Sequence, residues 1–139
     1  MKKYTHVLLS LSLLFLLNFS TCRKEDPVSI NNPSKNIPVT ANATNAFSFV
    51  VDAQYFNYSN TQQLQFNADT LSIGITVSGF TSGNGAIIIK DGKDAAIYQR
   101  DLNSGLVLGE VISLITMPKS LSLNLNNFSG KITIAVAGK

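Results

Sequence analysis

Histidine, cysteine and tryptophan are scarce in this chain of 139 residues. It has one histidine, His6, one cysteine, Cys22, and no tryptophan. Most hydrolase triads use a histidine to activate the nucleophile, and zinc sites are built largely from histidine and cysteine. A glycosidase with two carboxylates would need a long cleft walled by aromatic side chains, which a small domain without tryptophan is poorly suited to build. We therefore expect a protein that is not an enzyme, with a small glycoside hydrolase as the less favoured alternative.

The body of the chain also has no excess of charge of either sign. The formal net charge is +3, with eleven Lys and Arg against eight Asp and Glu, but Lys2 and Lys3 belong to the extreme N-terminus. From Phe47 onward, basic and acidic residues are equal in number and interspersed. A nucleic-acid binder needs a basic stripe or patch. We expect no nucleic-acid partner.

The first 21 residues have the layout of a secretory signal peptide. A basic start is followed by an apolar stretch from Val7 to Leu17 and then by small polar residues. About 20 apolar residues are needed to span a bilayer, and Asn18 ends this run early. The pattern predicts a signal peptide over residues 1–21, and an uncleaved membrane anchor is the alternative.

The position of the single cysteine matches the end of this signal. Phe19-Ser20-Thr21-Cys22 resembles a bacterial lipobox, although the family favours an aliphatic residue and Gly or Ala where Phe19 and Thr21 stand. The resemblance implies that Cys22 becomes the lipidated first residue of a lipoprotein. Several acyl chains on Cys22 would give stable membrane anchoring, because each buried methylene contributes about 0.8 kcal/mol. A structural or redox role for Cys22 is the alternative, but the chain has no second cysteine to pair with it.

Three charged residues follow shortly after. Lys24-Glu25-Asp26 is similar to the export signal of surface lipoproteins in one Gram-negative phylum, a lysine followed by two acidic residues. This resemblance implies an outer-membrane protein, anchored by lipid and facing the cell exterior. The same three residues would also suit the start of a solvated linker.

The next segment has the composition of a tether. Residues 22–45 include three of the four prolines and several asparagines, and their isolated Val and Ile residues follow neither a strand nor a helix period. We expect residues 22–45 to form a disordered tether and residues 46–139 to form the folded domain.

Residues 46–139 carry the alternation of strands. Apolar residues recur at every second position in five segments, which predicts strands with one buried face. These segments are 47–51, 64–67, 71–78, 121–125 and 132–136. Asp91-Gly92-Lys93-Asp94 predicts the turn of a hairpin over residues 86–100. The segment 107–115 fits both helical spacing and a bent strand, and its β-branched residues favour the strand.

Glycine and asparagine clusters predict further turns at residues 82–85, 103–105 and 126–130. Seven to nine short strands at this spacing predict an all-β fold. We expect a small antiparallel β-sandwich, immunoglobulin-like or jelly-roll-like, with two sheets packed face to face. A barrel is the nearest alternative.

Two groups of residues are candidate sites. Tyr55, Asn57 and Tyr58 combine aromatic faces, which stack on sugar rings, with an amide that binds hydroxyls; Phe56 in the core with both tyrosines at a sheet edge is the competing interpretation. A second group lies around the predicted hairpin and could supply oxygen ligands to calcium, although Asp91-Gly92 is also common in simple turns. It consists of Asp91, Asp94 and Asp101.

Taken together, the patterns predict an envelope lipoprotein with no cofactor beyond its lipid. The folded domain is expected to act as a non-catalytic binding or accessory module for a glycan or another surface protein. The alternative is a structural or assembly subunit of an outer-membrane complex, which would present a long unpaired sheet edge or an apolar patch.

Overall fold

The computed structural model describes residues 35–139, and this part of the chain is all-β. Its six strands are β1 (Val39–Ala43), β2 (Ala46–Gln63), β3 (Thr70–Asp91), β4 (Ala96–Asp101), β5 (Leu106–Ser113) and β6 (Pro118–Gly138). The predicted signal peptide, Cys22 and the Lys24-Glu25-Asp26 signal lie outside the described residues. Within residues 35–139, no helix could cross a membrane.

The three long strands, β2, β3 and β6, are bent near their middles. At each bend the pairing register shifts, and residues with positive φ redirect the backbone. Glycine tolerates such angles because it has no Cβ, and asparagine tolerates them better than most residues. The residues concerned are Tyr55 in β2, Gly79 and Gly83 in β3, and Asn127 and Gly130 in β6.

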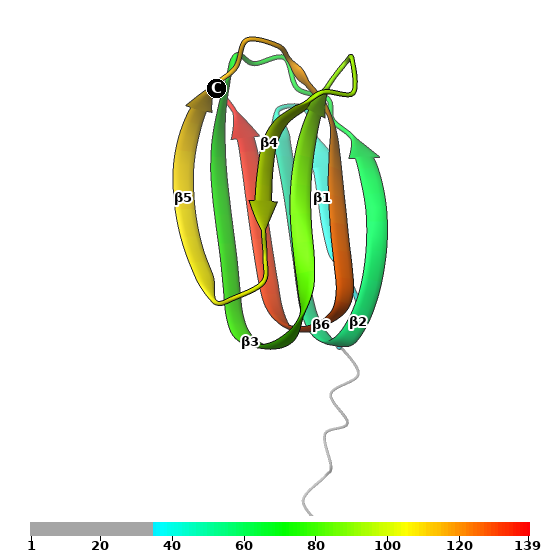
Figure 1. Ribbon diagram of the computed structural model, residues 1–139. Helices are drawn as coiled ribbons and strands as arrows, with labels where there is room; N and C mark the ends of the chain where they lie inside the picture. The colour runs from blue at the N-terminus through cyan, green and yellow to red at the C-terminus, as the bar shows by residue number, and fades with distance from the viewer. Residues whose placement is uncertain (1–34) are drawn as a thin grey trace, which may run out of the picture. The chain divides into compact units, whose positions relative to one another are not determined.

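The bends fold one hydrogen-bonded sheet into two layers (Figure 1). The five-strand layer has the order β1, β2 (46–53), β6 (131–138), β3 (70–78), β5. The four-strand layer has the order β2 (58–63), β6 (118–126), β3 (84–91), β4. All neighbouring segments are antiparallel. Each long strand therefore contributes its two halves to opposite layers.

One apolar core fills the space between the layers. In β3, Leu71, Ile73 and Ile75 are buried while the residues between them are not, as the alternation predicts. The core cluster also includes Phe49 and Phe128 from the other two long strands. Burial of these side chains is the main favourable contribution to folding, at roughly 1.5–3 kcal/mol each.

The prediction of a small antiparallel β-sandwich is confirmed. The 86–100 hairpin is present as the β3–β4 pair, and the ambiguous segment 107–115 is largely strand β5. The fold differs from the expectation in being one folded sheet rather than two separate sheets. Residues 35–139 form six strands instead of seven to nine, because three of them run through both layers.

Four local predictions were wrong. Residues 82–85 and 126–130 are bends inside β3 and β6, not turns between strands, because the partner strand bends with them and pairing resumes beyond each bend. Segment 64–67 buries Leu64 and Phe66 but forms no ladder. The predicted tether extends too far, since β1 within it pairs with β2 along its whole length.

Candidate functional site

The structure separates the three residues of the predicted glycan site. Tyr55 is 66% exposed at the bend of β2, where its backbone N–H donates to Ser129 Oγ at 2.9 Å. The Asn57 amide oxygen accepts the backbone N–H of Asn127 at 2.8 Å, so this side chain holds the bends of β2 and β6 together. Tyr55 and Tyr58 line different surface hollows.

Tyr58 belongs to the rim of the core. Its ring centroid lies 5.4 Å from that of Phe49, which is almost fully buried, and 5.7 Å from that of Phe56. Its hydroxyl accepts a hydrogen bond from the Asn60 amide at 3.1 Å. The structure thus gives Tyr58 a packing role and leaves Tyr55 as the one exposed aromatic of the predicted trio.

The three aspartates of the predicted calcium site do not converge: Asp91 and Asp94 share the hairpin loop, whereas Asp101 lies away from it. Asp91 Oδ1 accepts hydrogen bonds from the backbone N–H groups of Lys93 at 2.8 Å and Ala95 at 3.0 Å, which closes the hairpin loop. Asp94 forms an ion pair with Lys90 at 2.9 Å. Asp101 is the last residue of β4. At the rise per residue of a β-strand, it lies roughly 15 Å or more from that loop.

The surroundings of Asp91 explain its charge state. The backbone hydrogen bond from Lys93, and then that from Ala95, hold the pKa of Asp91 below its ordinary value. The Asp91 carboxylate therefore serves to hold the turn through these hydrogen bonds. Within the described chain, no three His, Cys, Asp or Glu side chains are grouped so that they could share a metal ion.

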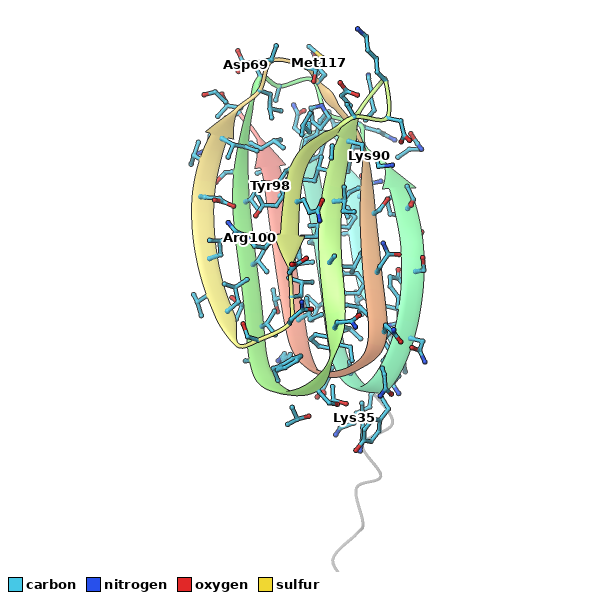
Figure 2. The ribbon with its side chains drawn as sticks, in the orientation of Figure 1. Lys35, Asp69, Lys90, Tyr98, Arg100 and Met117 are labelled. Carbon is cyan, nitrogen blue, oxygen red and sulfur yellow. The ribbon has the colours of Figure 1, made fainter. Side chains whose placement is uncertain are left out.

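A polar group that the sequence did not point to lies between the layers. Tyr98 and Arg100 of β4 (Figure 2) approach Glu110 of β5, with Arg100 Nη2 3.5 Å from Glu110 Oε1. Burial first, and the neighbouring Glu110 carboxylate second, raise the pKa of Tyr98 to about 12. Strands β4 and β5 are separate edge strands of opposite layers, so only the folded sheet brings these residues together.

A broad surface feature is the outer face of the five-strand layer. Three successive sets of register partners cross all five strands on this face. The valine row is Val39, Val50, Thr133, Thr76 and Val107. The central row is Ala41, Ser48, Ala135, Gly74 and Gly109. The alanine row is Ala43, Ala46, Ala137, Ser72 and Val111.

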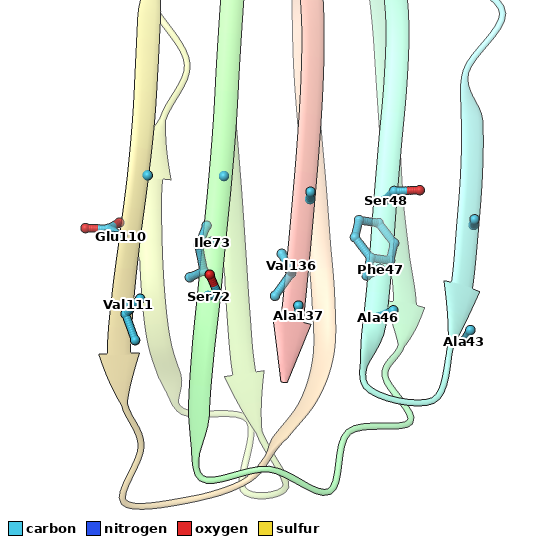
Figure 3. Close-up of a pocket in the computed structure, with 14 residues that line it drawn as sticks. Ala43, Ala46, Phe47, Ser48, Ser72, Ile73, Glu110, Val111, Val136 and Ala137 are labelled. Atoms are coloured by element: carbon cyan, nitrogen blue, oxygen red, sulfur yellow. The ribbon is translucent and has the colours of Figure 1, made fainter. Parts of the chain in front are cut away.

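These rows form a shallow apolar depression. Because the central and alanine rows consist almost entirely of Ala, Gly and Ser, the surface is low there and encloses a hollow of about 670 Å³. Figure 3 shows the short side chains of Ala43, Ala46, Ala137 and Ser72 along neighbouring strands. At its margins stand valines in contact with solvent, including Val39 at 64%, Val107 at 85% and Val111 at 62% exposure.

The outer face of the four-strand layer is polar by comparison. Neighbouring hydroxyl and amide side chains bond to each other across its strands, as in Thr61 with Ser122 at 2.8 Å and Ser59 with Asn124 at 2.7 Å. Side chains that satisfy one another have little need of a partner. The two faces of one sandwich thus differ sharply, and only the five-strand layer presents a broad apolar surface.

Sequence reasoning missed this surface, although its signal is present. The outward positions of 133–137 and 72–76 are small or β-branched, between core residues of the same strands. A single strand of this kind has the pattern of an ordinary half-buried strand. The face becomes recognisable only when the register places five such strands beside one another.

Comparisons with known proteins add no assignment. No family model and no curated protein matches the chain. Among solved structures, it is similar to the enzymatically active domain of tailspike protein 4 from bacteriophage CBA120, at 14% identity and a TM-score of 0.37 over 73% of this chain and 17% of that one. It is also similar to a chain of infectious bursal disease virus strain Gx, at 17% identity and a TM-score of 0.36 over 72% of this chain and 32% of that one.

Proposed function

We propose that this protein is a lipid-anchored protein of the outer membrane whose β-sandwich acts as a non-catalytic binding or accessory module. The observation that carries the proposal is the apolar outer face of the five-strand layer, with its hollow of about 670 Å³. A continuous apolar surface on a small domain marks a site of interaction. The lipobox-like leader and the Lys24-Glu25-Asp26 signal support the location.

The shape of the face favours a protein partner over a glycan. It lacks aromatic side chains among its three rows, whereas sugar rings are bound by stacking on exposed aromatic faces. The exposed Tyr55 stands at the bend of β2, beyond these rows. A broad, shallow, apolar face instead suits another sheet surface packed against it.

The position of the chain's entry into the domain is compatible with anchoring. Lys35 lies at the end of the domain formed by the bends, opposite Asp69 and Met117 (Figure 2). A lipid on Cys22 would be attached through this bend end. The loops at the opposite end, including the exposed Met117, would be the part farthest from the attachment point.

A structural subunit is the second candidate function. Strand β1 pairs only with β2 among the described strands, and its outward side chain Val39 is exposed. An unpaired strand edge with apolar side chains is a surface for stable assembly with another sheet. This candidate predicts that the protein is recovered from membranes in a complex of constant composition.

Radioactive palmitate labelling and protease shaving of intact cells test the location. We expect the full chain to incorporate label and to be digested from outside, and the Cys22→Ala variant to incorporate none. Replacing Lys24, Glu25 and Asp26 with alanine should keep the label and abolish external digestion. Label that persists in the Cys22→Ala variant would contradict the lipid assignment.

A further inference from the structure

We infer that the apolar face of the five-strand layer binds a second copy of this chain, so that two sandwiches pack face to face as a two-fold dimer. The inference rests on the proposed function and names the partner of the same surface. It follows from the arrangement of side-chain sizes on the face and from the area that the face offers.

The face is self-complementary about one axis. Consider a two-fold axis that runs across the strands along the central row. It places each strand over the same strand of the second copy and exchanges the valine row with the alanine row, because the two rows stand two residues to either side of the central row on every strand. Symmetric dimers require such a self-complementary patch.

On β1, β2, β6 and β3 the exchange sets the larger side chain over the smaller one, whereas on β5 it would set Val107 over Val111. Val50 would lie over Ala46 of the second copy, Thr133 over Ala137, and Thr76 over Ser72. Packing of large residues into the space above small ones is how two sheet faces interdigitate without voids. The twist of the layers confines the closest match to the three central strands, β2, β6 and β3, which carry these pairs.

Ala135 is the centre of this arrangement. It is the middle residue of the central row, and β6 is the middle strand of the layer. In the dimer it would face Ala135 of the second copy, with only methyl groups between the two strands. Ala135 is exposed in the single chain, so a long, charged side chain there can be accommodated by the isolated domain but not by the interface.

The area is sufficient for a weak specific dimer. Five strands spaced about 4.8 Å apart and three rows about 6.8 Å apart give a face of roughly 24 by 20 Å, or about 500 Å² per copy. Two copies would bury up to about 1,000 Å² in total, near the lower limit for specific interfaces. Confinement to a membrane raises the effective concentration of the protein, so that a weak interface of this size is sufficient for dimers to form.

Cysteine cross-linking in intact cells tests the dimer with the full chain. Copies with two different epitope tags and Ala135→Cys are treated with a short bis-maleimide, and the cross-linked product is examined for both tags. Ser122→Cys places the thiol on the polar face of the opposite layer and serves as the matched control. The unmodified chain reports any reaction of Cys22.

We expect a doubly tagged dimer for Ala135→Cys and none for Ser122→Cys or the unmodified chain. No dimer at position 135, or equal dimer at both positions, would overturn the inference. If Ala135→Cys cross-links to a protein of different mass and not to a second copy, the inference is also overturned, while the accessory function stays intact. Failure of palmitate labelling would affect the proposed location alone.

A charge at the centre provides a second measurement. In detergent, the full chain with Ala135→Lys should dissociate at least about tenfold more readily than the unmodified chain, because burying an unpaired ammonium group disfavours the interface strongly. Ser122→Lys should leave the dissociation constant within about twofold. Thermal unfolding of both variants verifies that the fold is intact. Unchanged dimerisation of Ala135→Lys would refute the proposed face.

Discussion

Arg100 of β4 and Glu110 of β5 join the two layers of the sandwich, with Nη2 and Oε1 3.5 Å apart. Both side chains point inward at the side of the domain where each layer ends in an edge strand. Inward-pointing charges at edge strands discourage pairing with strands of other molecules, because a newly added strand would have to desolvate them. The ion pair therefore helps to prevent β4 and β5 from pairing with strands of other molecules.

We predict that the two charges depend on each other. Removing one, in Arg100→Met or Glu110→Leu, leaves the other partly desolvated without its partner and should lower the melting temperature. The double variant should be at least as stable as the less affected single variant. Thermal unfolding of the four proteins completes a double-mutant cycle. Strictly additive effects would show that the pair is not coupled.

The raised pKa of Tyr98 predicts a loss of stability at high pH. The pKa is about 12 in the folded chain against an ordinary value of 10.0, so the unfolded chain releases this proton first. The stability that the folded chain gains from keeping Tyr98 protonated is fully present below pH 10 and is lost as the pH rises from 10 to 12. We expect it to reach at most about 2 kcal/mol, because the side chain is partly exposed to solvent.

Tyr98→Phe supplies the control for this effect. Its free energy of unfolding should decline less than that of the unmodified chain between pH 9 and pH 11.5, as measured by urea denaturation. The two proteins should show parallel pH dependence below pH 9. Identical curves over the whole range would mean that Tyr98 titrates normally.

Gly83 should be the most sensitive glycine of the bend. It has φ of +89°, and a Cβ at this position would lie 2.3 Å from the backbone oxygen of Asn127. Neither backbone can yield without separating β3 from β6. We predict that Gly83→Ala lowers the free energy of unfolding by about 2–4 kcal/mol.

Gly109 is the matched control for this substitution. It lies in a strand without positive φ, and a Cβ added there would have nothing within 4 Å. Gly109→Ala should change stability by no more than about 0.5 kcal/mol, or increase it slightly, since alanine restricts the unfolded chain. Equal losses at both positions in denaturant unfolding would argue against the bend as the cause.

The two tyrosines of the predicted glycan site should respond differently to truncation. Tyr58→Ala removes a ring that packs on Phe49 and should cost about 2–3 kcal/mol of unfolding free energy. Tyr55→Ala removes an exposed ring and should cost less than about 0.5 kcal/mol. Chemical denaturation measures both. A large loss at Tyr55 would reveal a structural role for that ring.

Local patterns along the chain were enough to predict the fold class and many of the buried side chains. Alternation in 71–77, 121–125 and 132–136 identified core positions that the structure confirms, because a strand with one buried face must repeat with a period of two. The Asp91-Gly92 turn was equally local, since its carboxylate bonds to backbone groups within four residues. Such features depend only on neighbours along the chain.

The remaining features depend on which strands pair in three dimensions. Residues 82–85 and 126–130 have turn-like composition, yet they bend continuous strands because β3 and β6 pair on both sides of the bend. The pairing of the strands also brings Ala41, Ala135 and Gly109 into one row. Together with the bends, it places Arg100 beside Glu110. No periodicity within a single strand encodes which strands become neighbours, so neither the apolar face nor the charge pair could be recognised before the register was known.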